Sequence, residues 1–271
     1  MHGCKKPEIP ADTASFLGKK DISAYEDELQ KIEERRVKIF KSLGIESSKV
    51  LSYCVVRKGR AAKEIIKEAE DSEAEVIITG THGSSGLRET LFGTHTWEVI
   101  KHSPVPVLAV PGNALYKGVR NIVFATEYRQ GEIPAISYLA HWAKMLSAQL
   151  TVIHVSNYAM SKEAEGILLK DFQKQVTEKI PYNMIKLHLM KSDDITDGLN
   201  RYCLDHGADL LAMSPEKPFF IAKLFNPVAS VTRKMVYHTK IPLMTIPDFY
   251  DPAYLKLWSV FEPDDIEKGD F

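Results

Sequence analysis

The chain has 271 residues, of which 44% are hydrophobic and 26% are charged, and its formal net charge at pH 7 is −1. This length suggests one large or two ordinary domains, and the hydrophobic fraction is enough for packed cores. The near-neutral charge, without a stripe of lysine and arginine, argues against nucleic acid as the main partner. No apolar run reaches the roughly 18 residues that a membrane helix needs.

The amino terminus and the cysteines point to a reduced compartment. The first residues lack the apolar core of a signal peptide. Cys4, Cys54 and Cys203 are an odd, scattered set, which indicates neither a disulfide framework nor a zinc site. We therefore expect a cytoplasmic protein with no metal centre.

The first part of the chain alternates between helical and strand-like patterns. The helix expected over residues 61–69 carries one apolar stripe, made by Ala62, Ile65, Ile66 and Ala69. In chain order, we expect a helix over 24–43, a strand over 50–56, a helix over 61–69, a strand over 75–79, a helix over 95–102 and a strand within 103–111.

Glycines follow the strand at 75–79 directly, in the run Gly80-Thr81-His82-Gly83, and recur at Gly93-Thr94 before the next helix. Glycines at a strand-to-helix junction let backbone amides approach a bulky anion, and the helix dipole then favours its negative charge. The spacing is neither the dinucleotide fingerprint nor the Walker loop. The pattern predicts a phosphate cradle of another kind.

This stretch resembles the universal stress protein family, whose ATP-binding members carry Gly-x2-Gly-x9-Gly-Ser/Thr at this place. The positions that match the family's phosphate and ribose motif are Gly80, Gly83, Gly93 and Thr94. The closing strand within residues 103–111 also looks like that of the family. His82 and His95 lie on the same loops and can lend amides or imidazoles to phosphates; the equally weighted alternative is that they are ordinary loop histidines.

The second part of the chain repeats the first. Glu75–Gly80 corresponds to Asp209–Ser214, Leu91–Thr94 to Leu224–Pro227, and His102–Pro111 to His238–Pro247. We expect strands over 119–126, 149–155, 184–190, 209–213 and 242–246, and helices over 133–147, 162–179, 195–206 and 228–238, with Gly207 as a C-cap.

Strands that alternate with helices predict an α/β protein with two doubly wound parallel-sheet units. The resemblance implies that these are of the adenine-nucleotide alpha-hydrolase-like type. We place a first copy at residues 1–113, a second copy at 118–248 and a carboxyl-terminal tail at 249–271. The first copy is expected to be incomplete, because no strand-helix-strand pattern precedes residue 24. We therefore expect the strand at 50–56 to be displaced, poorly ordered or paired with another chain.

The second copy has lost the glycines. Ser214, Lys217 and Asn226 stand for them, and Pro227, which lacks an amide donor, stands for the hydroxyl residue. Glu127 sits where family members end their first strand with an acidic residue, so the base side is partly preserved. We weigh a non-binding structural copy above an anion site at Lys217.

Two further features of the second copy are expected to be structural. His154 is interpreted as a strand residue rather than a ligand. The pair Asp193-Asp194 is interpreted as helix capping rather than a metal site.

The resemblance implies a tandem universal stress protein that responds to ATP, AMP or ADP, with Mg²⁺ accompanying ATP. ATP binding is expected to be weak, because the strands that carry the family's adenine contacts are missing from the first copy. We expect no committed enzyme, with slow ATP hydrolysis at most. Expected partners are an unidentified protein and either a second chain in a homodimer or the two copies in an intramolecular pseudo-dimer. Two alternatives are an interaction scaffold that binds no nucleotide and an adenylate-handling enzyme.

Overall fold

The computed structural model describes residues 19–46, 50–51, 53–80, 94–112, 114–157, 161–215 and 231–247. The chain divides into two compact units, Met1–Ile65 and Ile66–Phe271. The expected tail at 249–271 lies outside the described residues. The expected boundaries between the two sequence copies stay a prediction.

The first compact unit contains a long polar helix, α2 (Lys19–Ser42), and the start of α3 (Ala61–Asp71). Ion pairs one turn apart join Glu28 to Lys31 and Glu33 to Arg36, as is common on solvated helices. The expected strand over 50–56 is absent from the described residues there, where Val55 alone forms an isolated bridge. These residues contribute none of the strands of the sheet described next.

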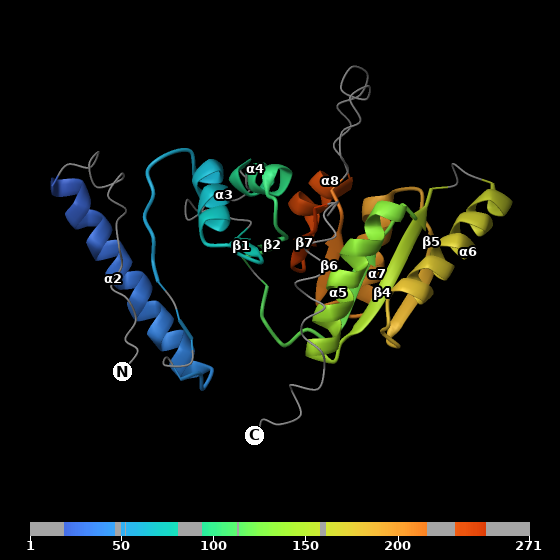
Figure 1. The fold of residues 1–271 in the computed structure, drawn as a ribbon, viewed down its shortest axis with the longest axis horizontal. Helices are drawn as coiled ribbons and strands as arrows, with labels where there is room; N and C mark the ends of the chain where they lie inside the picture. The colour runs from blue at the N-terminus through green and yellow to red at the C-terminus, as the bar shows by residue number, and fades with distance from the viewer. Residues whose placement is uncertain are drawn as a thin grey trace, which may run out of the picture. The chain divides into compact units, whose positions relative to one another are not determined.

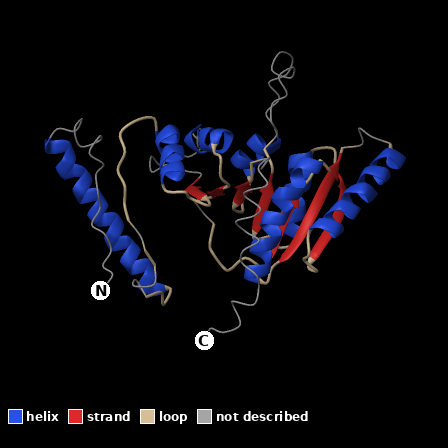
Figure 2. Ribbon diagram, viewed as in Figure 1, coloured by secondary structure: helices blue, strands red, loops and turns tan. Residues whose placement is uncertain are grey.

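The second compact unit is built on one seven-stranded sheet in the order β1-β2-β7-β6-β3-β4-β5, with helices on both of its faces (Figures 1 and 2). The strands of the first copy are β1 (Ile77–Gly80) and β2 (Val107–Val110). Those of the second copy are β3 (Asn121–Ala125), β4 (Gln149–Ser156), β5 (Ile185–Lys191), β6 (Leu210–Met213) and β7 (Leu243–Thr245). The expected α/β class with parallel strands is confirmed.

The two copies meet at the closing strands β2 and β7, which pair antiparallel while every other pair in the sheet is parallel. Val107 faces Thr245 and Ala109 faces Leu243, and all four residues are buried. The Thr245 hydroxyl also donates to the Val107 carbonyl at 3.4 Å. The described strands of both copies therefore form one continuous sheet.

Helices α5 (Ile133–Leu146) and α6 (Lys162–Lys179) pack together on one face of the second copy, in front of the strands in Figure 1. Helices α7 (Ile195–Asp205) and α8 (Val231–His238) pack together on the other face. In the first copy, α4 (Thr94–His102) packs on β2. The core between sheet and helices is closely packed, since Phe124, Leu139 and Phe172 are at most 1% exposed.

Helix α7 is bounded by the signals expected from the sequence. The Asp194 carboxylate accepts a hydrogen bond of 3.0 Å from the Asp197 amide at the helix start. Gly207 follows the helix with φ +59°, a left-handed conformation that glycine adopts without strain. The interpretation of Asp194 as a cap is confirmed. The Asp197 amide lowers the pKa of Asp194 below its ordinary value.

None of the helices in the described ranges combines the length and apolar character that crossing a lipid bilayer requires.

We predict that Leu243→Ala, at the junction of the two copies, lowers the free energy of unfolding by about 2–5 kcal/mol, because it leaves a cavity beside the β2–β7 pair. Leu204→Ala is the matched control, since Leu204 is 76% exposed on α7. Its effect should stay within about 0.5 kcal/mol. Urea denaturation followed by circular dichroism measures both changes, and equal effects would contradict the burial of the junction.

We predict that Asp194→Ala lowers the free energy of unfolding by about 1 kcal/mol at pH 7 through loss of the cap. Because the pKa of Asp194 is lowered in the folded chain, the carboxylate's contribution is present above its ordinary value of 3.8 and is lost as the pH falls below it. The difference from the parent chain should therefore shrink in acid. Asp193→Ala, at the exposed neighbouring acid, removes no cap and should change the free energy of unfolding by less than about 0.5 kcal/mol. Thermal melting, measured from pH 3 to pH 7 in steps of about half a pH unit, compares the stability of both variants with that of the parent chain.

Candidate ligand pocket

The two ends of the glycine motif lie together in the structure. Gly80 ends β1, α4 begins at Thr94, and the Thr96 hydroxyl donates to the Gly80 carbonyl at 3.1 Å. His95 is exposed in the first turn of α4. His82, Gly83 and Gly93 lie outside the described residues. The strand-to-helix junction that a phosphate cradle requires is therefore present at its two described ends.

The structure also gives the register between the two copies. Ser103, just after α4, donates its hydroxyl to the carbonyl two residues on and accepts that residue's amide, and Thr239, just after α8, does the same. Since the helices end at His102 and His238, Thr232 is the counterpart of Thr96. Counting back along the sequence then sets Ser230 opposite Thr94.

This register corrects the repeat alignment of the sequence analysis, in which Pro227 stood for Thr94. With Ser230 in that place, the second copy keeps a hydroxyl residue before its helix, and Ala229 replaces the glycine at Gly93. The sheet supports the other equivalence, Ser214 with Gly80, because Ile77 faces Val107 in the first copy as Leu211 faces Leu243 in the second.

The second copy contains a pocket of about 280 Å³ at the carboxyl ends of β3, β4 and β6. The chain winds from β3 toward β5 on one side and from β6 toward β7 on the other, so the pocket lies at the topological switch point where open α/β sheets bind ligands. Much of its wall is apolar and comes from strands and from α7, at Ala125, Ile153, Val155, Leu199 and Met213. Such a wall suits a small, flat ligand.

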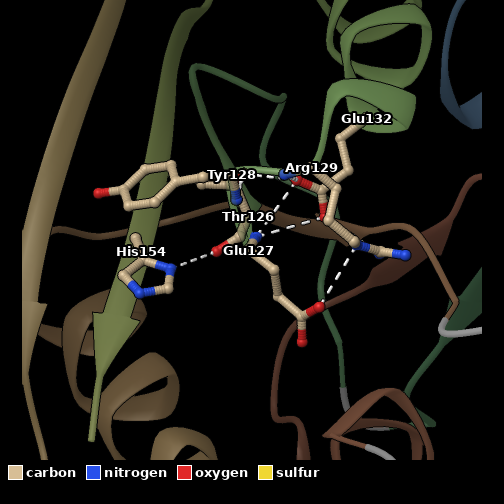
Figure 3. Close-up of polar contacts among 6 residues, drawn as sticks. All are labelled: Thr126, Glu127, Tyr128, Arg129, Glu132 and His154. Atoms are coloured by element: carbon tan, nitrogen blue, oxygen red, sulfur yellow. Dashed lines mark hydrogen bonds and ion pairs between the residues drawn. The ribbon is translucent and has the colours of Figure 1, made fainter. Parts of the chain in front are cut away.

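Glu132, only 1% exposed, organises the loop that follows β3 (Figure 3). Its carboxylate accepts the Thr126 hydroxyl at 2.6 Å and the amides of Glu127 and Arg129, each at 3.2 Å. The Arg129 guanidinium adds an ion pair at 3.1 Å. The buried carboxylate thus holds one wall of the pocket in a single conformation.

Burial raises the pKa of Glu132, while the Thr126 hydroxyl and the charge of Arg129 act in the opposite direction. A buried carboxyl group is tolerated only where such partners compensate its lost hydration. The contacts of Glu132 therefore serve the loop rather than a ligand.

His154, in β4, connects this loop to α6. Its Nδ1 lies 2.7 Å from the Thr126 carbonyl, to which it donates because a carbonyl only accepts. Its Nε2 lies 3.8 Å from an oxygen of Glu165, which is 5% exposed in the first turn of α6. The expectation that His154 is a strand residue is confirmed, and the residue also lines the pocket.

Tyr128 stacks on His154, with ring centroids 4.3 Å apart, and holds φ at +60°. A left-handed backbone is costly for an aromatic residue and marks a conformation that the surrounding contacts impose. Burial, followed by the charge of Glu165, raises the pKa of Tyr128 to about 12. The phenol is therefore neutral at physiological pH.

Ser214 is the residue that points to a ligand. It follows β6, is 5% exposed, and lines the pocket. Its hydroxyl has no hydrogen-bond partner in the described part of the protein. An unpartnered buried hydroxyl costs free energy unless something that binds there satisfies it.

The sequence pointed to Glu127 through the family resemblance and to Ser214 through the repeat, but it did not assign Glu132, Glu165 or Thr232 to the site. For Thr232 a signal existed, because counting back from His238 leads to it. For the two glutamates no such signal existed, because glutamate is usually exposed and the sequence does not distinguish a buried glutamate from an exposed one.

We predict that Glu132→Ala lowers the free energy of unfolding by about 3 kcal/mol, because it strands buried donors of the loop. The matched control is Glu178→Ala on α6, where Glu178 is exposed and lies 4.0 Å from Lys174. That change should cost less than about 1 kcal/mol. Urea denaturation measures both, and similar losses would contradict the role given to Glu132.

Comparison with known proteins shows what the first part of the chain resembles. Residues 8–111 match the model of the universal stress protein family. Over 96 residues, the chain is 41% identical to universal stress protein MJ0577 of Methanocaldococcus jannaschii, a stretch that covers 34% of this chain and 58% of that protein. The match thus spans less than two thirds of the relative's length.

Solved structures give the fold. The crystal structure of a universal stress protein from Archaeoglobus fulgidus matches 89% of this chain and 84% of its own, with a TM-score of 0.61 and 16% identity. Another Archaeoglobus fulgidus structure, a universal stress protein in complex with dAMP, matches 47% of this chain and 97% of its own, with a TM-score of 0.38 and 16% identity. Over residues 8–111, the chain is therefore similar to the universal stress protein family.

Proposed function

We propose that this protein is a nucleotide-responsive universal stress protein, which binds adenine nucleotide and passes its bound state to an unidentified partner. For the nucleoside part of such a ligand, the observation that carries the proposal is the pocket at the switch point of the second copy, whose buried Ser214 hydroxyl is unpartnered in the described residues. A ligand there would bury its ring against the apolar wall and satisfy that hydroxyl.

The first copy supplies the second line of support. The contact between Thr96 and Gly80 brings the start of α4 to the end of β1, as amide binding of an anion requires. We propose that Gly80, Gly83, Gly93 and Thr94 hold the phosphates of ATP, AMP or ADP, with His82 and His95 beside them. Mg²⁺ is expected to accompany ATP, and the affinity for ATP is expected to be weak.

The β2–β7 junction supports the proposal of an intramolecular pseudo-dimer. The closing strands of the two copies pair antiparallel inside one chain, with Ala109 facing Leu243. Antiparallel pairing of equivalent strands is the geometry that an approximate two-fold axis produces.

The alternative is a scaffold that binds no nucleotide and acts through its surface alone. The replacement of the motif glycines in the second copy by Ser214, Lys217 and Ala229 favours this alternative for that copy. Nucleotide titration separates the two functions, because a scaffold would respond to no nucleotide at all.

We predict that ATP with Mg²⁺ binds the chain and that Gly93→Ala weakens this binding by about tenfold or more, since a methyl group blocks the approach of phosphate to the amides. Gly166→Ala is the matched control, because a Cβ at Gly166 in α6 meets no atom within 4 Å. It should leave ATP affinity unchanged. Isothermal titration calorimetry measures all three chains.

The proposal fails if neither ATP nor AMP binds the parent chain. If ATP binds and Gly93→Ala leaves it unaffected, nucleotide binding stands, and the glycine motif is not its site.

A further inference from the structure

We propose that the pocket of the second copy selects the uncharged nucleoside over its phosphates, with Glu165 as the specificity-determining residue. The inference rests on the proposed function, because it assumes that the pocket recognises the adenosine part of an adenine nucleotide. It adds that the two copies bind different forms of that chemistry.

The described wall of the pocket is acidic. It carries the carboxylates of Glu127, Glu132 and Glu165 against the single guanidinium of Arg129. Arg129 is already shared, with its Nη2 3.1 Å from Glu132 and its Nε 3.3 Å from Glu127. A phosphate that entered would therefore meet an excess of negative charge at short range, where screening by salt is weak.

Hydrogen-bonding capacity points the same way. Carboxylates only accept hydrogen bonds, so Glu127 and Glu165 call for donors on a ligand. A nucleoside offers donors in its ribose hydroxyls and its exocyclic amino group, whereas a phosphate dianion offers acceptors. Two buried hydroxyls on the wall, Ser214 and Thr232, can match either role without adding charge.

Among these acids, Glu165 is the best candidate for the specificity-determining residue. Glu132 is committed to the loop, and Glu127 is half-exposed beside Arg129. Glu165 is buried, and one of its carboxylate oxygens lies 3.8 Å from Nε2 of His154. It sits in the first turn of α6, where the helix dipole stabilises a carboxylate.

The size of the pocket agrees with a small occupant. Its volume of about 280 Å³ lies just under the range of about 300–1,000 Å³ that ligand sites span. The sequence beyond β6 no longer offers glycines for a phosphate, since Ser214, Lys217 and Ala229 occupy their places.

The test is calorimetry on the full chain with adenosine as the titrant and AMP as its competitor. The measured heat then comes only from sites that bind adenosine. We expect AMP to compete at least about tenfold more weakly than adenosine binds, as a repulsion of one unit charge predicts. Raising the salt concentration should reduce this difference in affinity between adenosine and AMP.

Glu165→Gln keeps the size and one acceptor of the side chain and removes its charge, so it should bring AMP to within about threefold of adenosine. Glu163→Gln is the matched control, because Glu163 lies in the same turn of α6 but is exposed and outside the pocket wall. It should preserve the full discrimination.

Ser214→Leu fills the pocket and should abolish adenosine binding while leaving the binding of ATP by the first copy. Ser214→Val, a smaller block, replaces it if thermal melting shows that the leucine variant does not fold. Loss of adenosine binding with either variant assigns the site.

Three outcomes overturn the inference. If AMP binds more tightly than adenosine at a site that Ser214→Leu removes, nucleotide binding stands and the proposed selectivity is wrong. Adenosine binding that persists in the blocked variants assigns the site elsewhere. If adenosine, AMP and ATP all fail to bind the parent chain, the proposed function falls together with the inference.

Discussion

The antiparallel pairing of β2 with β7 is the constraint on which the described architecture depends. Strands need partners for their backbone groups, and the closing strand of each copy finds one in the closing strand of the other. Ala109 and Leu243, which face each other there, are fully buried. Because this junction lies within one chain, it forms without the encounter of two molecules.

The elements of the second copy could be predicted closely, because local signals agree with the tertiary fold there. Helix α6 spans Lys162–Lys179 as expected, and α7 lies between Asp194, which caps its start, and Gly207, which follows its end in the left-handed conformation. The residues at 50–56 show the limit of such reasoning. Their apolar pattern resembles that of a strand, yet a strand exists only where a neighbour accepts its hydrogen bonds.

The candidate site was less accessible to sequence reasoning, and for a physical reason. The pocket wall brings together Glu132, His154 and Glu165 from separate elements, so no spacing along the chain reveals their proximity. Ser214 was noticed as the loss of a glycine, whereas the structure presents it as a buried hydroxyl. In the sequence Ser214 marks the loss of the glycine motif, whereas in the structure it lines the pocket of the second copy.

The junction and the pocket are made by different strands of the same sheet, and this separation has a consequence. Residues that join the copies, such as Leu243 and Thr245, lie within the strands, whereas Ser214 and Glu127 follow the carboxyl ends of β6 and β3. A change of charge in those loops leaves the hydrogen bonds of the sheet intact. One chain can therefore carry glycines after β1 and acidic residues after β3, because the hydrogen bonds of the sheet do not depend on the side chains of these loops.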